Sequence, residues 1–115
     1  MIRINGRDYS TVSAGDRGFQ YGDGLFETIL VNQGMPLLWQ RHLDRLLKGC
    51  ERLRIDKPDI EVLTDEIRQF SSRVERGVIK LVYTRGEGGR GHQPPANVEP
   101  TTVLMASELP PGIVR

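Results

Sequence analysis

The sequence DRGFQYGDGLFET occupies residues 16–28 and joins a polar, glycine-rich segment to an apolar one. Its glycines, Gly18, Gly22 and Gly24, let the backbone adopt positive φ and approach another surface closely. Such a segment is typical of a loop that lines a site, although glycine clusters are also common in ordinary turns. The β-branched and aromatic residues at its end predict a strand over residues 25–31.

Composition indicates an ordinary globular chain. The 115 residues suffice for one domain with its own core. A formal net charge of +1 gives no basis for binding nucleic acid or a membrane surface. Cys50 is the single cysteine, and its place among apolar helix positions predicts a buried thiol. No apolar run approaches a membrane span and the N-terminus lacks a signal-peptide pattern, so a cytoplasmic protein is expected.

Two β-hairpins are predicted in the first forty residues. Asn5-Gly6, the dipeptide most favoured in a two-residue turn, separates residues 1–4 from residues 7–9 and predicts an N-terminal hairpin. The strand at 25–31 is followed by Asn32-Gln33-Gly34 and then by residues 35–39, which predict a partner strand.

The hydrophobic period changes at residue 40 and predicts helices. Apolar side chains recur at three- and four-residue steps from Trp39 to Leu53, which gives one apolar helix face. A second helix is predicted to start near Pro58, which suits a first turn, and to stop at Gly77. Both helices are amphipathic, so each needs a surface to pack against.

The remaining chain predicts two more strands and a long connection. Strands are expected at residues 78–84 and 101–106, joined by residues 85–99, and a connection of that length is usually functional. The expected fold class is therefore α+β, with an antiparallel β-sheet and two helices packed on one face. Residues 109–115 have the composition of a linker.

Residues 16–28 closely resemble the N-terminal segment of the fold-type IV pyridoxal-phosphate enzymes. That group includes branched-chain and D-amino-acid aminotransferases and aminodeoxychorismate lyase. Residues 84–91, which read TRGEGGRG, together with the ending Phe-Glu-Thr, look most like the lyase. The resemblance covers nearly all of the chain and implies the fold of the N-terminal domain of this family.

The resemblance also assigns two candidate binding residues in the first half of the chain. The sequence HLDRL at residues 42–46 is similar to the segment whose arginine binds the cofactor phosphate, which implies that role for Arg45. A planar two-pronged guanidinium suits a phosphate dianion, although Arg45 could equally belong to a solvated helix face. Phe26 matches an aromatic residue that faces the substrate in related enzymes, but it could also be ordinary strand core.

A second cluster lies in the long connection. Arg90-Gly91-His92 resembles the Arg-x-His pair that the D-amino-acid aminotransferases use as part of a carboxylate trap for the neighbouring subunit. Lyases of the group more often have tyrosine at the position of His92, so this residue departs from their pattern. The alternative for His92 is a solvent-exposed loop histidine.

The catalytic lysine that such an enzyme needs has no counterpart in this sequence. None of Lys48, Lys57 and Lys80 matches the family position, which lies in the second domain. The resemblance thus implies that residues 1–108 are a small N-terminal domain, that residues 109–115 begin an interdomain linker, and that this fragment alone is inactive. No catalytic residue is assigned within the chain.

The resemblance implies a lyase that converts 4-amino-4-deoxychorismate to 4-aminobenzoate and pyruvate in folate biosynthesis. Its cofactor would be pyridoxal 5′-phosphate, not held stably by this fragment, its substrate small and anionic, and its assembly a homodimer. Two alternatives stay open: a D- or branched-chain amino-acid aminotransferase, and a non-catalytic binding or dimerisation module. No metal site is expected, because two distant histidines and one cysteine lack metal-ligand spacing.

Overall fold

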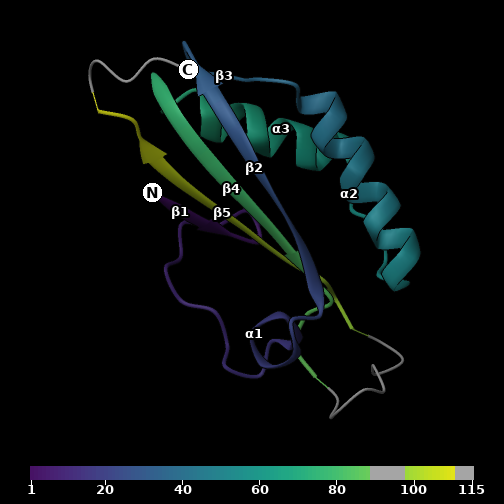
Figure 1. Ribbon diagram of the computed structural model, residues 1–115. Coiled ribbons are helices and arrows are strands. Elements are labelled where there is room, and N and C mark those ends of the chain that lie inside the picture. The colour runs from purple at the N-terminus through teal and green to yellow at the C-terminus, as the bar shows by residue number, and fades with distance from the viewer. Residues whose placement is uncertain (89–97, 111–115) are drawn as a thin grey trace.

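The computed structural model describes residues 1–88 and 98–110, and in this part of the chain a β-sheet carries two long helices (Figure 1). The elements, in chain order, are β1 (Ile2–Ile4), α1 (Arg17–Tyr21), β2 (Gly24–Asn32), β3 (Met35–Pro36), α2 (Trp39–Leu53), α3 (Ile60–Ser71), β4 (Arg76–Thr84) and β5 (Thr101–Glu108). The strand order in the sheet is β1-β5-β4-β2-β3, and each neighbouring pair is antiparallel.

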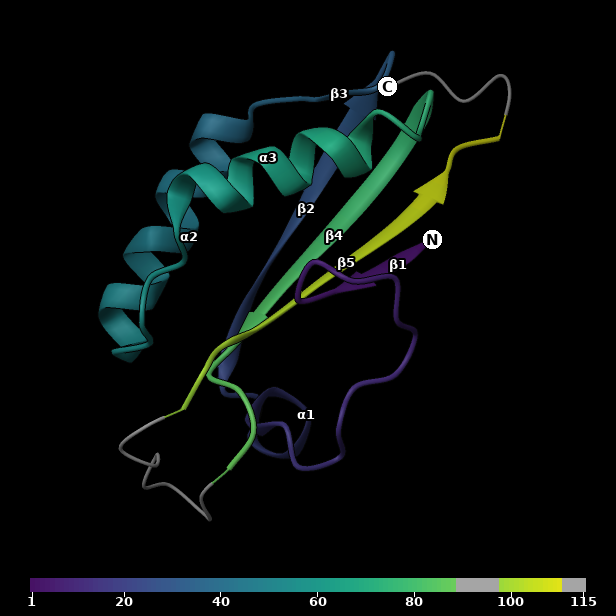
Figure 2. The same cartoon turned by 180° about the vertical axis from the view of Figure 1, so that it is seen from behind.

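The pairing of β2 with β4 determines where the loops meet. The two strands are paired along their whole length, from Gly24 opposite Thr84 to Asn32 opposite Arg76. The start of β2 and the end of β4 therefore lie at the same end of the sheet. α1 lies beyond this end of the strands, where the chain also leaves β4 (Figure 2). The glycine-rich stretch and the start of the long connection are thus neighbours.

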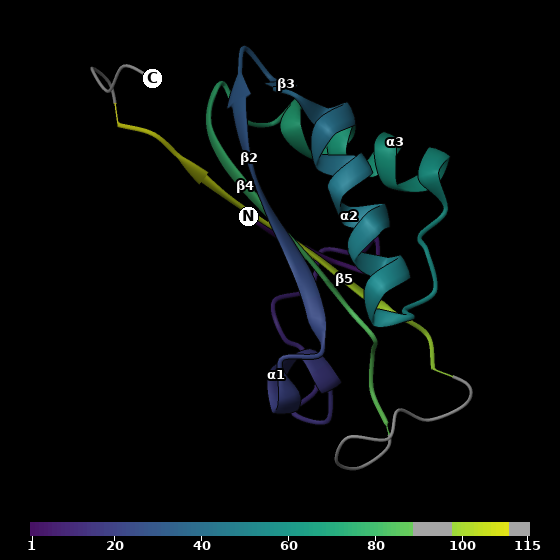
Figure 3. The same ribbon diagram turned by 45° about the vertical axis from the view of Figure 1, so that its right-hand side comes forward.

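Both long helices cover one face of the sheet (Figure 3). Their apolar side chains and those of the sheet form one core: Ile29, Val31, Leu43, Leu46, Cys50, Ile55, Leu63, Ile67, Phe70, Val74, Ile79, Leu81, Tyr83 and Leu104. The predicted fold class, α+β with an antiparallel sheet and two helices packed on one face, is confirmed. Within the described ranges, no helix is both long enough and apolar enough to cross a membrane.

Each long helix forms where the sequence supplies an apolar stripe. On α2, Leu43, Leu46 and Cys50 are buried at helical spacing. α3 begins after Asp59, whose carboxylate accepts a hydrogen bond from the backbone N–H of Val62 at 3.1 Å. This cap satisfies one of the N–H groups that a helix start leaves without an intrahelical partner.

The prediction of an N-terminal hairpin is right about the turn and wrong about the second strand. Asn5 and Gly6 have φ values of 51° and 78°, as a turn with two left-handed positions requires. Arg7 forms a single antiparallel bridge with Ile4, but residues 8 and 9 do not continue as a strand, and β1 pairs along its length with β5 instead. The Asn5 side chain accepts a hydrogen bond from the backbone N–H of Thr102 at 2.8 Å, which ties the turn to β5.

The second predicted hairpin is present, but its partner strand is short. Gln33 and Gly34 form the turn with φ values of 52° and 72°. β3 ends at Pro36 instead of extending over the predicted residues 35–39. Leu38, with φ of 56°, then turns the chain directly into α2. One further hydrogen bond, from the Leu37 N–H to the Leu30 carbonyl oxygen at 2.8 Å, joins the chain to β2 before this turn.

The second helix is shorter at both ends than predicted. Pro58 precedes the cap residue Asp59 and so lies outside the first turn. The helix ends at Ser71, well before Gly77, which belongs to β4. A Cβ atom on Gly77 would meet the carbonyl oxygen of Ser107 on β5. Glycine therefore permits close strand packing at this position and does not end a helix.

Candidate functional site

The glycine-rich stretch folds into α1 and a turn packed on the end of β4. The Asp16 carboxylate accepts a hydrogen bond from the Gly18 N–H at 2.8 Å, and Gly22 ends the helix with φ of 66°. A Cβ atom on Gly18 would collide with the Thr84 side chain, and one on Gly24 would crowd the backbone beside it. Gly22 thus supplies the predicted left-handed conformation, whereas Gly18 and Gly24 permit close packing.

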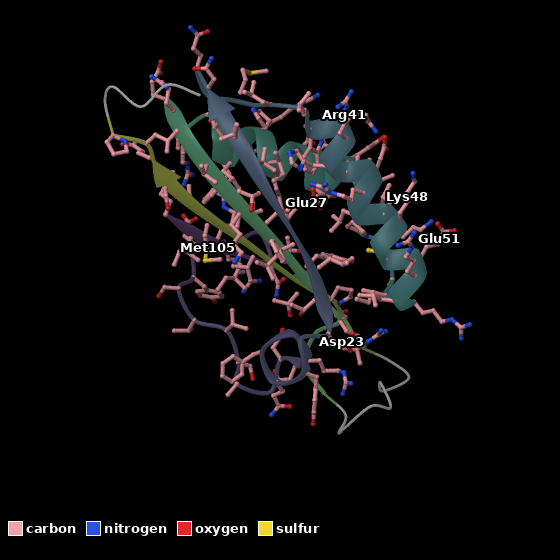
Figure 4. All side chains as sticks on the ribbon, in the orientation of Figure 1. Asp23, Glu27, Arg41, Lys48, Glu51 and Met105 are labelled. Carbon is pink, nitrogen blue, oxygen red and sulfur yellow. The ribbon has the colours of Figure 1, made fainter. Side chains whose placement is uncertain are left out.

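Asp23 connects this stretch to two other elements. Its Oδ2 accepts hydrogen bonds from Arg17 Nε at 2.9 Å and from Arg85 Nε at 2.7 Å. Arg85 also donates to the carbonyl oxygens of Leu53 at 2.6 Å and Arg54 at 2.9 Å, where α2 ends. Figure 4 shows Asp23 at the end of β2 nearest α1. One carboxylate therefore links α1, the end of β4 and the end of α2.

The environment of Asp23 favours its ionised form. Burial by itself would raise the pKa of this carboxyl group, but hydrogen bonds and positive charge from Arg85 and Arg17 outweigh burial and lower the pKa. Arg17 is 2% exposed, so its charge requires a partner of this kind. The Asp23 carboxylate thus remains ionised at neutral pH between its two arginine partners.

A second ionic cluster joins β2 to α2. Arg45 Nε donates to both carboxylate oxygens of Glu27, at 3.1 Å and 3.0 Å, and Arg45 Nη2 donates to Oε1 at 2.7 Å. His42 Nδ1 lies 2.6 Å from the same Oε1. His42 and Arg45 are three residues apart on α2, so both side chains reach the strand from one helix face. Glu27 is the shared partner.

Burial is unequal within this cluster. The Glu27 side chain is 5% exposed, whereas that of Arg45 is 71% exposed. Burial by itself would raise the pKa of Glu27, but hydrogen bonds from Arg45 and His42 lower it overall. The hydrogen bond with Glu27 also raises the pKa of Arg45. The structure thus holds a permanently charged guanidinium by one edge and leaves the rest of it open to solvent.

A groove of about 500 Å³ lies beside this ion pair, between β2 and α2. Its lining includes Glu27 and three cationic side chains of α2, those of Arg45, Lys48 and Arg52. Figure 4 shows Glu27 between the ribbons of β2 and α2, and Lys48 on α2. The excess of positive charge suits an anionic group such as phosphate or carboxylate. We refer to this hollow as the β2–α2 groove.

Phe26 lies at the boundary between this groove and the opposite face of the sheet. It lines the β2–α2 groove and also an open-face hollow of about 570 Å³ that includes Val82, Val103 and Met105. Met105, labelled in Figure 4, lies away from the long helices. Phe26 is 63% exposed, so its interpretation as ordinary strand core is wrong. Lys80 Nζ lies 5.1 Å from the centre of its ring.

The structure brings two of the four predicted site residues together. Arg45 and Phe26 line the same groove, from α2 and β2 respectively. Arg90 and His92 lie outside the described residues. Cys50 is fully buried and burial raises the pKa of its thiol, as expected for a core cysteine. In residues 1–88 and 98–110, no three His, Cys, Asp or Glu side chains gather in a way that could hold a metal ion.

Sequence reasoning missed Glu27 and the placement of Lys80 beside Phe26. A signal for Glu27 was present, because side chains alternate along a strand and Glu27 shares a face with Ile29 and Val31. A carboxylate in the buried series of a strand requires a cationic or hydrogen-bonding partner. For Lys80 no local signal existed, because its approach to Phe26 depends on the register of β2 and β4.

Comparison with known proteins places this arrangement in a family. The sequence model of the family described as Amino-transferase class IV matches residues 24–115, which include Phe26, Glu27 and Arg45. The chain belongs to the class IV aminotransferase family. Within that family it spans about two fifths of the length of the relatives described next.

Three similar proteins show what the chain resembles. It is 34% identical to the aminodeoxychorismate lyase of Vibrio harveyi over 110 residues, which are 96% of this chain and 41% of that protein. The solved structure of 4-amino-4-deoxychorismate lyase from Pseudomonas aeruginosa is 45% identical, with a TM-score of 0.89, over 96% of this chain and 40% of that one. A hypothetical aminotransferase from Mycobacterium tuberculosis, solved in a PLP-bound form, is 28% identical, with a TM-score of 0.76, over 90% of this chain and 36% of that one.

Proposed function

We propose that residues 1–108 form the N-terminal domain of a pyridoxal-phosphate-dependent aminodeoxychorismate lyase. The intact enzyme would convert 4-amino-4-deoxychorismate to 4-aminobenzoate and pyruvate, an elimination that leaves an aromatic product of use in folate biosynthesis. The observation that carries the proposal is Arg45, a guanidinium fixed at one edge and open at the other, on the wall of a cationic groove. Similarity to lyases from Vibrio harveyi and Pseudomonas aeruginosa supports the choice of reaction.

The residues of the β2–α2 groove fit the phosphate of this cofactor. The open edge of Arg45 can donate two parallel hydrogen bonds to a phosphate, and Lys48 and Arg52 add positive charge nearby. The volume of about 500 Å³ lies within the range of small-molecule sites. When bound, pyridoxal phosphate supplies an electron sink for bond cleavage next to the substrate nitrogen.

The open-face hollow fits a small anionic substrate. Phe26 offers an exposed ring that can pack on a planar substrate, and Lys80 adds a cation beside it. Arg90 and His92 would complete carboxylate recognition, lent across the interface of a homodimer. The exposed apolar side chains of this face support burial against a second domain or subunit.

The chain's own lysines do not provide the catalytic amine in this proposal. Residues 109–115 would begin a linker to a second domain that carries the Schiff-base lysine, so residues 1–115 alone would be inactive. A cytoplasmic enzyme is part of the proposal and agrees with Cys50 as a free, buried thiol.

The first experiment incubates the natural chain that contains residues 1–115 with pyridoxal 5′-phosphate. A lysine-bound cofactor band, fixed by borohydride reduction, is expected, together with formation of 4-aminobenzoate and pyruvate from 4-amino-4-deoxychorismate. The isolated residues 1–115 should show neither the lysine-bound cofactor band nor product formation. If the natural chain shows neither the band nor turnover, the proposed enzyme function is wrong, and the protein is a binding or dimerisation module.

One observation favours a second candidate within the same family. Arg90-Gly91-His92 has the histidine of the D-amino-acid aminotransferase pattern, and the Mycobacterium tuberculosis relative is described as an aminotransferase. If the natural chain binds the cofactor and transfers amino groups from D-alanine or a branched-chain amino acid without forming 4-aminobenzoate, the aminotransferase is the correct function.

A further inference from the structure

We propose that Glu27 is a positioning residue, which holds Arg45 so that its open edge faces the cofactor phosphate. The inference rests on the proposed function, because it concerns how the same phosphate site is built. Its starting point is an unusual placement: a 5% exposed carboxylate in a strand whose neighbours on the same face, Ile29 and Val31, are core residues.

Without Glu27, nothing else described would fix the guanidinium of Arg45. The side chain is 71% exposed, and each of its hydrogen bonds in the structure is donated to Glu27. An exposed arginine that lacks a partner samples many rotamers. Binding of a phosphate then has to order the side chain, and the lost conformational entropy weakens the affinity. Glu27 removes that freedom before the ligand arrives.

The geometry of the pair leaves the correct edge available. Glu27 receives its hydrogen bonds from Nε and Nη2 of Arg45, which form the side edge of the guanidinium. No hydrogen bond from Nη1 is seen in the described part of the chain, and Nη1 with the outer side of Nη2 makes a second, end-on edge. That edge remains free for a two-pronged contact with phosphate.

His42 holds the carboxylate in turn. Its Nδ1 lies 2.6 Å from Oε1 of Glu27, and its side chain is only 15% exposed. Because His42 and Arg45 approach from the same face of α2, the carboxylate is bound from two points on one helix. The Glu27 carboxylate therefore has a fixed orientation, and its hydrogen bonds fix the orientation of the Arg45 guanidinium.

Two effects of Glu27 on phosphate binding have opposite signs. As a negative charge next to the site, it opposes an anion, so simple electrostatics predicts tighter binding when it is neutralised. As a positioning residue it favours binding, so loss of its fixed charge should weaken binding. Tighter phosphate binding after Glu27 is neutralised would therefore indicate simple electrostatic repulsion, and weaker binding would indicate positioning.

The experiment measures how tightly the natural chain that contains residues 1–115 binds pyridoxal 5′-phosphate and pyridoxal, which lacks the phosphate. Glu27→Gln is expected to weaken binding of pyridoxal phosphate about tenfold, as loss of an outer-shell partner does at metal sites, and to leave pyridoxal binding unchanged. Asp44→Asn is the matched control, because it removes an exposed carboxylate of α2 that bonds Gln40 and not Arg45. It should leave both affinities unchanged.

Arg45→Lys distinguishes the inference from the proposed function. It should weaken binding of pyridoxal phosphate, and Glu27→Gln should add little in that background, because Glu27 acts through Arg45. If Arg45→Lys weakens binding but Glu27→Gln tightens it or leaves it unchanged, positioning by Glu27 is wrong and the phosphate role of Arg45 survives. If Arg45→Lys has no effect, or the chain binds no cofactor, the proposed function fails and the inference fails with it.

A variant that retains the charge covers the case in which Glu27→Gln does not fold, which loss of pyridoxal binding would reveal. Glu27→Asp shortens the side chain by one methylene and pulls the carboxylate back from Arg45. It should weaken binding of pyridoxal phosphate several-fold with pyridoxal binding intact. Wild-type affinity for pyridoxal phosphate in Glu27→Asp would overturn the inference.

Discussion

At the scale of single residues, Asp23 shows how one carboxylate can stabilise a loop. It accepts hydrogen bonds from two arginines, one of them almost fully buried. Asp23→Asn should lower the free energy of unfolding at pH 7 by about 2 kcal/mol, because hydrogen bonds to a charged group are lost. Denaturation by urea measures the change, and Asp8→Asn is the control, since Asp8 is 69% exposed.

The same substitution should show a defined pH dependence. The pKa of Asp23 in the folded chain is lowered from its ordinary value of 3.8, so the folded state favours the ionised form. Its stabilisation is therefore complete above that ordinary value and is lost as pH falls through the lower, folded pKa. Urea denaturation should therefore give the full difference in free energy of unfolding between wild type and Asp23→Asn at pH 7, and a smaller difference at pH 3. An equal difference at both pH values would contradict a role of the charge.

Gly18 provides a steric test of the glycine-rich stretch. A Cβ atom there would collide with the methyl group of Thr84. Gly18→Ala should lower the free energy of unfolding by about 1 to 3 kcal/mol, the usual cost of overpacking. Thr84→Ser removes that methyl group and should recover part of the loss in the double variant, measured by the same denaturation. Full additivity of the two changes would contradict the predicted contact.

Sequence reasoning named some of the residues that line the β2–α2 groove and missed others for physical reasons. Arg45 could be found because the HLDRL pattern is local. The exposure of Phe26 could not be deduced, since an aromatic residue in an apolar strand suits a core equally well. Glu27 could have been found from strand alternation, but its partners His42 and Arg45 depend on how α2 packs on β2.

At the scale of elements, Arg85 joins the end of β4 to the end of α2. It donates to the carbonyl oxygens of Leu53 and Arg54, which a helix end otherwise leaves to solvent. Arg85→Lys should speed amide hydrogen exchange in the last turn of α2 and in residues 16–24, because a lysine cannot span both partners. Arg68→Lys on the exposed side of α3 is the control. Unchanged exchange in α2 would contradict the predicted link.

The types of the longer elements were predictable, but the short helix α1 lies where a loop was predicted, and several element ends depended on tertiary contacts. The apolar period of α2 and the turn at Asn5-Gly6 are local signals, and both are confirmed. The local partner predicted for β1 is reduced to one bridge between Ile4 and Arg7, and its pairing with β5 was missed because it involves residues about a hundred positions away. Gly77 was interpreted as a helix stop, but the approach of β5 is what requires glycine there.

At the scale of the whole molecule, one sheet face lacks a helical layer in the described residues. Phe19 and Phe26 are 76% and 63% exposed on this side. Residues 1–115 should therefore associate at rising concentration, as measured by sedimentation, because exposed apolar surface favours contact. The double variant Phe19→Ser, Phe26→Ser should shift the chain towards monomer. A wild-type chain that stays monomeric throughout would contradict this.

The position of β1 at the edge of the sheet has a consequence for synthesis on the ribosome. β1 is made first, yet its one partner strand in the described sheet is β5, which is made last among these elements. β2, α2, α3 and β4 can begin to assemble as soon as they leave the exit tunnel, since β2 pairs with β4 and the side chains of both helices share a core with these strands. The first strand must wait unpaired until almost the whole of this domain has emerged, and only then can the sheet be completed.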